Sequence, residues 1–87
     1  MGAVKVTVEQ QEDLGVLAKA AVLHALGKED PKNSVLVCGA VAHVVPLLAE
    51  SDIRQLMWEV EGAIAGGKEN HYEWVDLMTV LRRVDRP

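Results

Sequence analysis

The chain has 87 residues, which is enough for one small domain. Nearly half of the residues are apolar and a quarter are charged, which excludes a chain that is disordered by composition. The formal net charge of −4 disfavours a general nucleic-acid binder, because such proteins present a basic face. The single cysteine, Cys38, excludes an internal disulfide, so we expect a reducing, cytoplasmic setting in which Cys38 is a small buried residue.

A first helix is predicted to begin after Thr7, because Thr7 and Gln10 have the spacing of a capping box. Apolar residues then recur at helical spacing, and Gly27 is a stop signal. Gly15 lies inside this helix and weakens it by about 1 kcal/mol relative to alanine. The predicted apolar stripe consists of Leu14, Leu17, Ala18, Ala21 and Ala25.

A polar loop is predicted from Lys28 to Ser34, and a second helix over residues 37–48, kinked or ended by Pro46. The run from Val35 to Ala49 is apolar around most of a helix, with His43 as its one strongly polar residue. It is shorter than the roughly 20 residues that cross a bilayer, so no membrane span is expected. Two interpretations remain open. Either its neighbours bury the helix completely, or one side packs on the core and the other on a partner.

Ser51 is predicted to cap a third helix, and a fourth follows a glycine-rich segment. Both helices carry apolar residues at helical spacing. These are Ile53, Leu56, Met57 and Val60, then Trp74, Leu77, Met78 and Leu81. We therefore predict an all-α fold of four helices in one domain, residues 8–84. It is built from two packed helix-loop-helix units, 8–48 and 51–84.

The segment between the last two helices has the residue spacing of a loop of known type. Counted from Gly62, Gly67 stands at the sixth position, where such a loop turns, and Glu73 at the twelfth, just before Trp74. Residues 52–61 add the apolar and acidic pattern of an entering helix. The chain thus resembles a pair of EF-hands, similar to one lobe of a calmodulin-like protein or myosin light chain. The helix pattern counts from Glu61, so the match assumes an inserted residue.

The resemblance implies EF-hands without their calcium ligands. Ligand positions in the second loop hold Gly62, Ile64 and Gly66, which have no side-chain oxygen. In the first half, Asp30 is the one matching ligand candidate, and lysines flank it. We therefore expect no bound metal and no other cofactor, with a weak calcium sensor kept as an alternative.

The function that the resemblance implies is a non-catalytic, calcium-independent adaptor of the light-chain type. It would hold a basic amphipathic helix of a larger motor or cytoskeletal protein in an apolar groove, and so associate with the cytoskeleton. Acidic residues would face basic positions of the partner: Glu50, Asp52, Glu59 and Glu61. The predicted groove consists of Val41, Val44, Val45, Leu48, Met57, Val60, Met78 and Leu81.

A second interpretation is a small regulatory or DNA-associated domain of the helix-turn-helix type. Arg82, Arg83 and Arg86 would then contact phosphates, although the acidic charge disfavours this. No nucleophile–base pair and no metal-ligand spacing of histidines can be recognised, so an enzyme is not expected. Trp58 lies off the apolar stripe of its helix, and is either an exposed anchor for a partner or folded over its own helix end.

Overall fold

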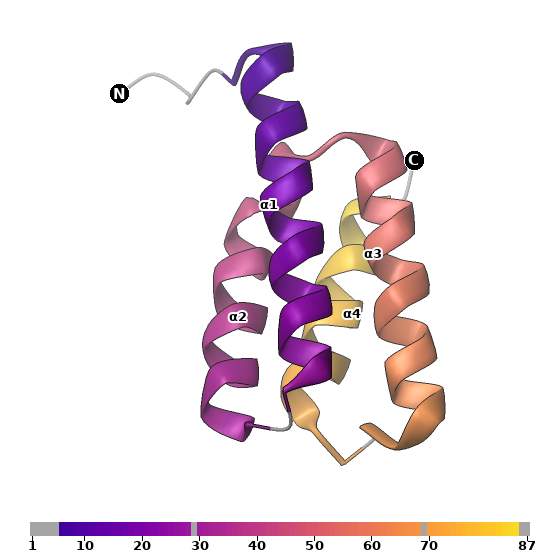
Figure 1. The fold of residues 1–87 in the computed structure, drawn as a ribbon. Helices are drawn as coiled ribbons and strands as arrows, with labels where there is room; N and C mark the ends of the chain where they lie inside the picture. The colour runs from indigo at the N-terminus through magenta and orange to yellow at the C-terminus, as the bar shows by residue number, and fades with distance from the viewer. Residues whose placement is uncertain (1–5, 29, 69, 86–87) are drawn as a thin grey trace.

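The computed structural model describes residues 6–28, 30–68 and 70–85, and within them the chain is all helical with no strand. The prediction of an all-α fold with four helices is confirmed (Figure 1). The elements are α1 (Val8–Gly27), α2 (Pro31–Val44), η1 (Val45–Leu47), α3 (Glu50–Ala63), η2 (Ile64–Lys68) and α4 (Tyr72–Asp85). Among the described residues, no helix is both long and apolar enough to cross a membrane.

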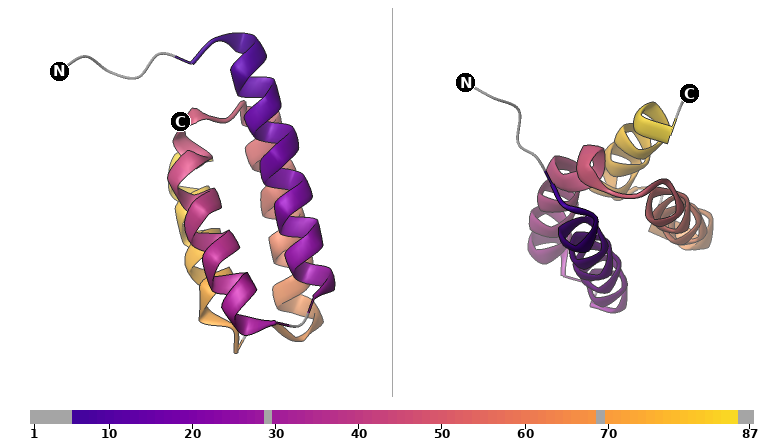
Figure 2. Two further views of the ribbon diagram at one scale, coloured as in Figure 1. Left: turned by 60° about the vertical axis from the view of Figure 1, so that its left-hand side comes forward. Right: turned by 90° about the horizontal axis from the view of Figure 1, so that it is seen from above.

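The four helices pack as a bundle in which α1 contacts α2 and α3, and α4 contacts the same two helices (Figure 2). The turns that follow α1 and α3 lie at one end of the bundle, and the η1 connection lies at the other (Figure 1). Because the chain runs up and down in this way, α2 and α4 are neighbours that run in the same direction. The seam between these two parallel helices lies along one side of the bundle.

The core is mostly aliphatic, with one indole and the sulfur-containing side chains of Cys38 and Met78. Its largest fully buried side chains are Trp74, Leu56, Leu77, Leu81, Val22, Val45 and Val60. Ile53 and Met78 are also buried, and Met57 packs against the cluster from its edge. The apolar stripes predicted for the third and fourth helices are thus confirmed.

Helix α1 begins as predicted. Thr7 is the N-cap, its hydroxyl accepts a hydrogen bond from the Gln10 amide at 3.1 Å, and the Gln10 side chain accepts one from the Thr7 amide. The helix ends at Gly27, again as predicted. The predicted stripe is wrong at Leu17, which is 66% exposed, whereas Val22 is fully buried. The buried face of α1 is the face that contacts α2 and α3. Apolar residues lie all around this helix, so their spacing did not indicate which face would be buried.

Helix α2 begins at Pro31, so the predicted polar loop from 28 to 34 is wrong in its second half. The Asp30 side chain caps the helix by accepting a hydrogen bond from the Lys32 amide at 3.1 Å. Pro31 occupies the first turn, where a missing amide hydrogen is harmless. Pro46 lies in η1, after α2 has ended, which confirms the predicted break.

Two boundaries around α3 also differ from expectation. The N-cap is Ala49 and makes no side-chain hydrogen bond, so Ser51 lies inside the first turn and is not the cap. At the other end Gly62 still belongs to α3. Gly67 has φ of 118° and makes the bend, as predicted, because glycine has no Cβ to oppose a positive φ. The resemblance implies twelve-residue loops over residues 28–39 and 62–73. In the structure, residues 31–39 belong to α2 and residues 72–73 to α4, so neither loop has that length.

Candidate functional site

The side chains of the predicted groove lie in the interior of the bundle. Six of them are buried and belong to the core: Val41, Val45, Leu48, Val60, Met78 and Leu81. Val44 and Met57 are half-buried and pack against it. These eight residues fill the space between the helices, so a partner helix could reach them only if the bundle opened. Trp74, from the predicted loop end, is also part of this core.

An open groove lies instead along the seam between α2 and α4, which we call the α2–α4 groove. It consists of two hollows of about 240 and 490 Å³ that share Val35, Glu73 and Asp76. The first is also lined by Cys38, Gly39, Ala42, Leu77 and Val80. The second is also lined by Pro31, Asn70, His71 and Tyr72. Because three residues line both hollows, the two lie next to each other along the same side of the bundle.

The groove combines small and apolar residues on its floor with exposed apolar residues at its rim. A Cβ added at Gly39 would meet no atom within 4 Å, so the backbone of α2 is open to a close approach there. Val35 is 55% exposed and Tyr72 is 75% exposed. The apolar run that starts at Val35 is therefore buried on one side only, with Val35 and Leu36 on the solvent side. This excludes complete burial of the helix by its neighbours, and a partner on its exposed side stays a prediction.

The charged side chains of the groove are acidic. Asp76 is exposed, whereas Glu73 has a side chain only 13% exposed. The Oε2 atom of Glu73 has no hydrogen-bond partner among the described residues, and Nδ1 of His71 lies 3.8 Å away. No Lys or Arg is among the described residues that line the groove. Among the described lining residues, His71 is the basic side chain next to these carboxylates.

Cys38 lies at the bottom of the same groove and is 4% exposed, as expected for a small buried residue. Burial, together with a smaller contribution from the Glu73 carboxylate, raises the pKa of the Cys38 thiol to about 12. The thiolate is the nucleophilic form, and a thiol with this pKa is almost entirely protonated at neutral pH. Cys38 is therefore part of the floor, and the arrangement does not provide an activated nucleophile.

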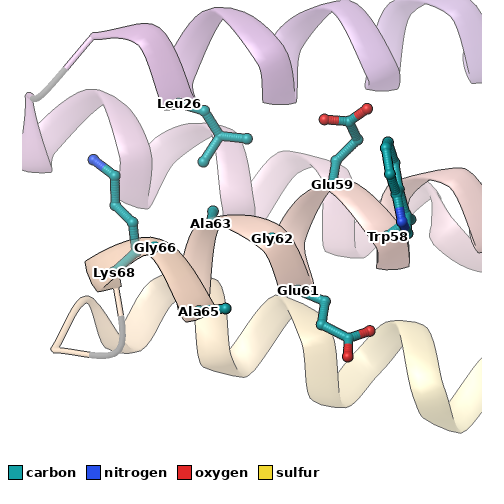
Figure 3. Close-up of a pocket in the computed structure, with 9 residues that line it drawn as sticks. All are labelled: Leu26, Trp58, Glu59, Glu61, Gly62, Ala63, Ala65, Gly66 and Lys68. Carbon is teal, nitrogen blue, oxygen red and sulfur yellow. The ribbon is translucent and has the colours of Figure 1, made fainter.

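A second concave surface of about 630 Å³ lies over the end of α3 and over η2, and we call it the α3 hollow (Figure 3). Trp58 forms one edge and is 73% exposed, so it is not buried against its own helix end, and its role as an anchor for a partner stays a prediction. Other lining residues are Leu26, Glu59, Glu61, Gly62, Ala63, Ala65, Gly66 and Lys68.

The four acidic residues that were expected to face a partner do not share one surface. Asp52 pairs with Lys19 of α1 at 2.9 Å, and Glu50 pairs with Arg54 on its own helix. Glu59 and Glu61 line the α3 hollow. The acidic residues of the α2–α4 groove, Glu73 and Asp76, were not recognised as a pair, because their common surface depends on α2 lying beside α4.

No group of three or more His, Cys, Asp or Glu side chains in the described part of the chain is placed to hold a metal ion. Comparisons with protein-family models, with curated proteins and with solved structures found no match to this chain.

Proposed function

We propose that this chain is a non-catalytic interaction domain that holds a basic amphipathic helix of another protein in the α2–α4 groove. The observation that carries the proposal is the composition of that groove, which has an apolar floor and two carboxylates as its charged groups. An amphipathic helix buries its apolar stripe in such a groove and places Lys or Arg against the carboxylates.

The length of the groove supports a helical partner. On α2 the lining residues extend from Pro31 to Ala42, eleven residue steps that span about 17 Å at 1.5 Å per residue. Three turns of a partner helix cover this distance, so its anchors have the spacing i, i+3 or i+4, and i+7. Gly39 and Ala42 permit the close approach, because neither has a long side chain that would hold the partner away.

The carboxylates would select the charge of the partner. Asp76 is exposed and meets an approaching cation first, whereas Glu73 lies deeper with one oxygen unsatisfied. A guanidinium or ammonium group next to the pair would reduce the repulsion between two carboxylates on adjacent turns of α4. The same interaction becomes weaker as salt increases, since exposed charges are screened.

The proposed function is still the adaptor function expected from the sequence, but the binding surface is the α2–α4 groove and not the predicted groove. Binding through the eight interior residues would require the core to open, whereas the α2–α4 groove is accessible in the closed bundle. The light-chain comparison, the motor or cytoskeletal partner and the cytoskeletal location rest on the sequence resemblance alone. Calcium independence is part of the proposal and is included in its test.

The test uses a synthetic peptide of about 14 residues with leucines at helical spacing and flanking lysines, against a matched peptide with glutamates in place of the lysines. Calorimetry is expected to give micromolar binding for the lysine peptide and at least about tenfold weaker binding for the glutamate peptide, a difference of about 1.4 kcal/mol. Asp76→Asn should weaken the lysine peptide and reduce its dependence on salt. About 1 mM calcium should change neither the affinity nor the melting temperature.

A groove-filling variant separates this surface from all others. Gly39→Leu projects a side chain into open space and is expected to reduce binding at least about tenfold. Ala40→Leu is the matched control, because Ala40 is an exposed neighbour on α2 that does not line the groove. Equal binding of the two peptides, or equal affinity of the two variants, would refute the proposal. Preferential, salt-sensitive binding of duplex DNA would favour the helix-turn-helix alternative.

A further inference from the structure

The α3 hollow has a shape that α3 of a second copy of this chain can fill. Its floor is made by the last turns of α3 and by η2, where Gly62, Ala63, Ala65 and Gly66 leave the backbone nearly bare. A Cβ added at Gly62 or at Gly66 would meet no atom within 4 Å. One turn before Gly62, the indole of Trp58 stands at the edge of the hollow, 73% exposed (Figure 3). One helix thus presents a large projecting side chain and, beside it, an empty space.

We propose that a second copy of this chain fills the α3 hollow, so that the protein forms a twofold-symmetric dimer through antiparallel α3 helices. A twofold axis that runs between the two α3 helices, perpendicular to both and level with Gly62, brings each Trp58 over the Gly62–Gly66 floor of the other copy. Trp58 and Gly66 are eight residues apart, about 12 Å along a helix, so the two contacts lie about equally far from the axis. At the axis, Gly62 meets its own copy, and its missing side chain lets the two backbones approach.

Two of the three charged side chains of the hollow, Glu59 and Lys68, are placed to pair with a second copy, whereas the third, Glu61, is directed to the α4 side (Figure 3). Glu59 lies at the Trp58 end and Lys68 at the opposite end, and both side chains rise on the α1 side of the hollow (Figure 3). The twofold axis exchanges the two ends and leaves the side unchanged. Lys68 of each copy is therefore placed at the Glu59 and Trp58 end of the other. An ammonium group in this position can pair with a carboxylate and lie over an indole face.

The proposed dimer is weak and does not depend on the proposed function. The contact depends on one large side chain, Trp58, and a shallow hollow in each copy, so we expect a Kd between about 10 µM and 1 mM. The surface lies on α3 and η2 with Leu26 of α1, whereas the α2–α4 groove lies on the other two helices. Failure of peptide binding at the groove would leave the dimer unaffected, and a monomeric protein could still bind the peptide.

Sedimentation velocity and tryptophan emission across this concentration range test the proposal on the full chain. Trp74 is fully buried, so a blue shift with rising concentration reports on Trp58. Gly62→Leu fills the hollow without a clash inside the monomer and is expected to raise the dimer Kd at least about tenfold. Trp58→Ala should do the same. Ala40→Leu on α2 is the matched control and should leave the Kd unchanged.

A charge exchange identifies the orientation. Glu59→Lys and Lys68→Glu should each weaken the dimer, and the double variant should recover most of the loss, because the two residues meet only across the twofold axis. Three results would overturn the proposal: a protein that stays monomeric at about 1 mM, a dimer that Gly62→Leu leaves intact, or a double charge variant that is no tighter than the single ones.

Discussion

Gly15 lies in the middle of α1, where replacing glycine with alanine normally stabilises a helix by about 0.8–1.0 kcal/mol. Here the glycine faces α3. A Cβ added at Gly15 would lie 2.7 Å from Cγ of Asp52, and closer still to its Oδ2. We therefore predict that Gly15→Ala gains no stability, because the space for its methyl group is occupied by the carboxyl group of Asp52.

The magnitude follows from the groups that must move. Non-bonded carbon atoms prefer a separation of about 3.5 Å, so the carboxyl group must retreat by about 1 Å. That carboxyl group pairs with Lys19 at 2.9 Å, and both side chains are largely shielded from water, with 15% and 26% exposed. Weakening the pair loses up to about 1 kcal/mol, with a further contribution from Asp52 in the first turn of α3. The propensity gain is thus cancelled or exceeded.

A double-mutant cycle measured by urea unfolding tests this reasoning. In the original sequence, Gly15→Ala is expected to leave stability unchanged or lower it by up to about 1 kcal/mol. In an Asp52→Ala background, the same change should stabilise by about 1 kcal/mol, or about 4–8 °C in melting temperature. Gly39→Ala is the matched control, since its Cβ meets open space, and it should stabilise in both backgrounds. If Gly15→Ala stabilises the original chain as much as Gly39→Ala does, the close approach of α1 and α3 is not a constraint.

Two further predictions concern pH and helix capping. Burial raises the pKa of Cys38 to about 12 from its ordinary value of 9.0, so the unfolded state ionises first as pH rises. The resulting stability is fully present below about pH 9 and is lost between about pH 9 and 12, by up to about 1.4 kcal/mol per pH unit. Urea midpoints of the original chain and of Cys38→Ala should therefore converge on raising the pH from 7 to about 10.5, and a constant difference would contradict the assignment. Thr7→Ala removes the acceptor of the Gln10 amide and should lower the free energy of unfolding by about 1 kcal/mol, whereas Thr7→Ser should retain most of it. Thermal unfolding of both variants checks this, and equal losses would show that the hydroxyl is not the stabilising group.

The sequence alone determined the buried faces of those helices that have one apolar face and one charged face. In α3 and α4, apolar residues at helical spacing alternate with charged ones, so the buried faces at Ile53, Leu56 and Val60, and at Trp74, Leu77 and Leu81, follow from the pattern itself. The capping box of Thr7 and Gln10 and the bend at Gly67 were also predictable from the sequence. The first depends on local hydrogen bonds and the second on the φ angle of a single residue. The start of α2 is also encoded locally, by the N-cap Asp30 followed by Pro31. The predicted loop from 28 to 34 was wrong because it did not take this pair as a helix start.

Tertiary structure decided which apolar faces of α1 and α2 turn inward. Apolar residues surround both helices, so the pattern alone cannot distinguish the exposed Leu17 from the fully buried Val22. It also decided where the open surfaces lie. Glu73 and Asp76 share a groove with Gly39 only because α2 and α4 are parallel neighbours, and Leu26 lines the same hollow as Trp58 only because α1 packs beside α3. Contacts between residues far apart in the chain depend on how helices choose their neighbours. That choice is made by the packing of the whole core, and no local pattern records it.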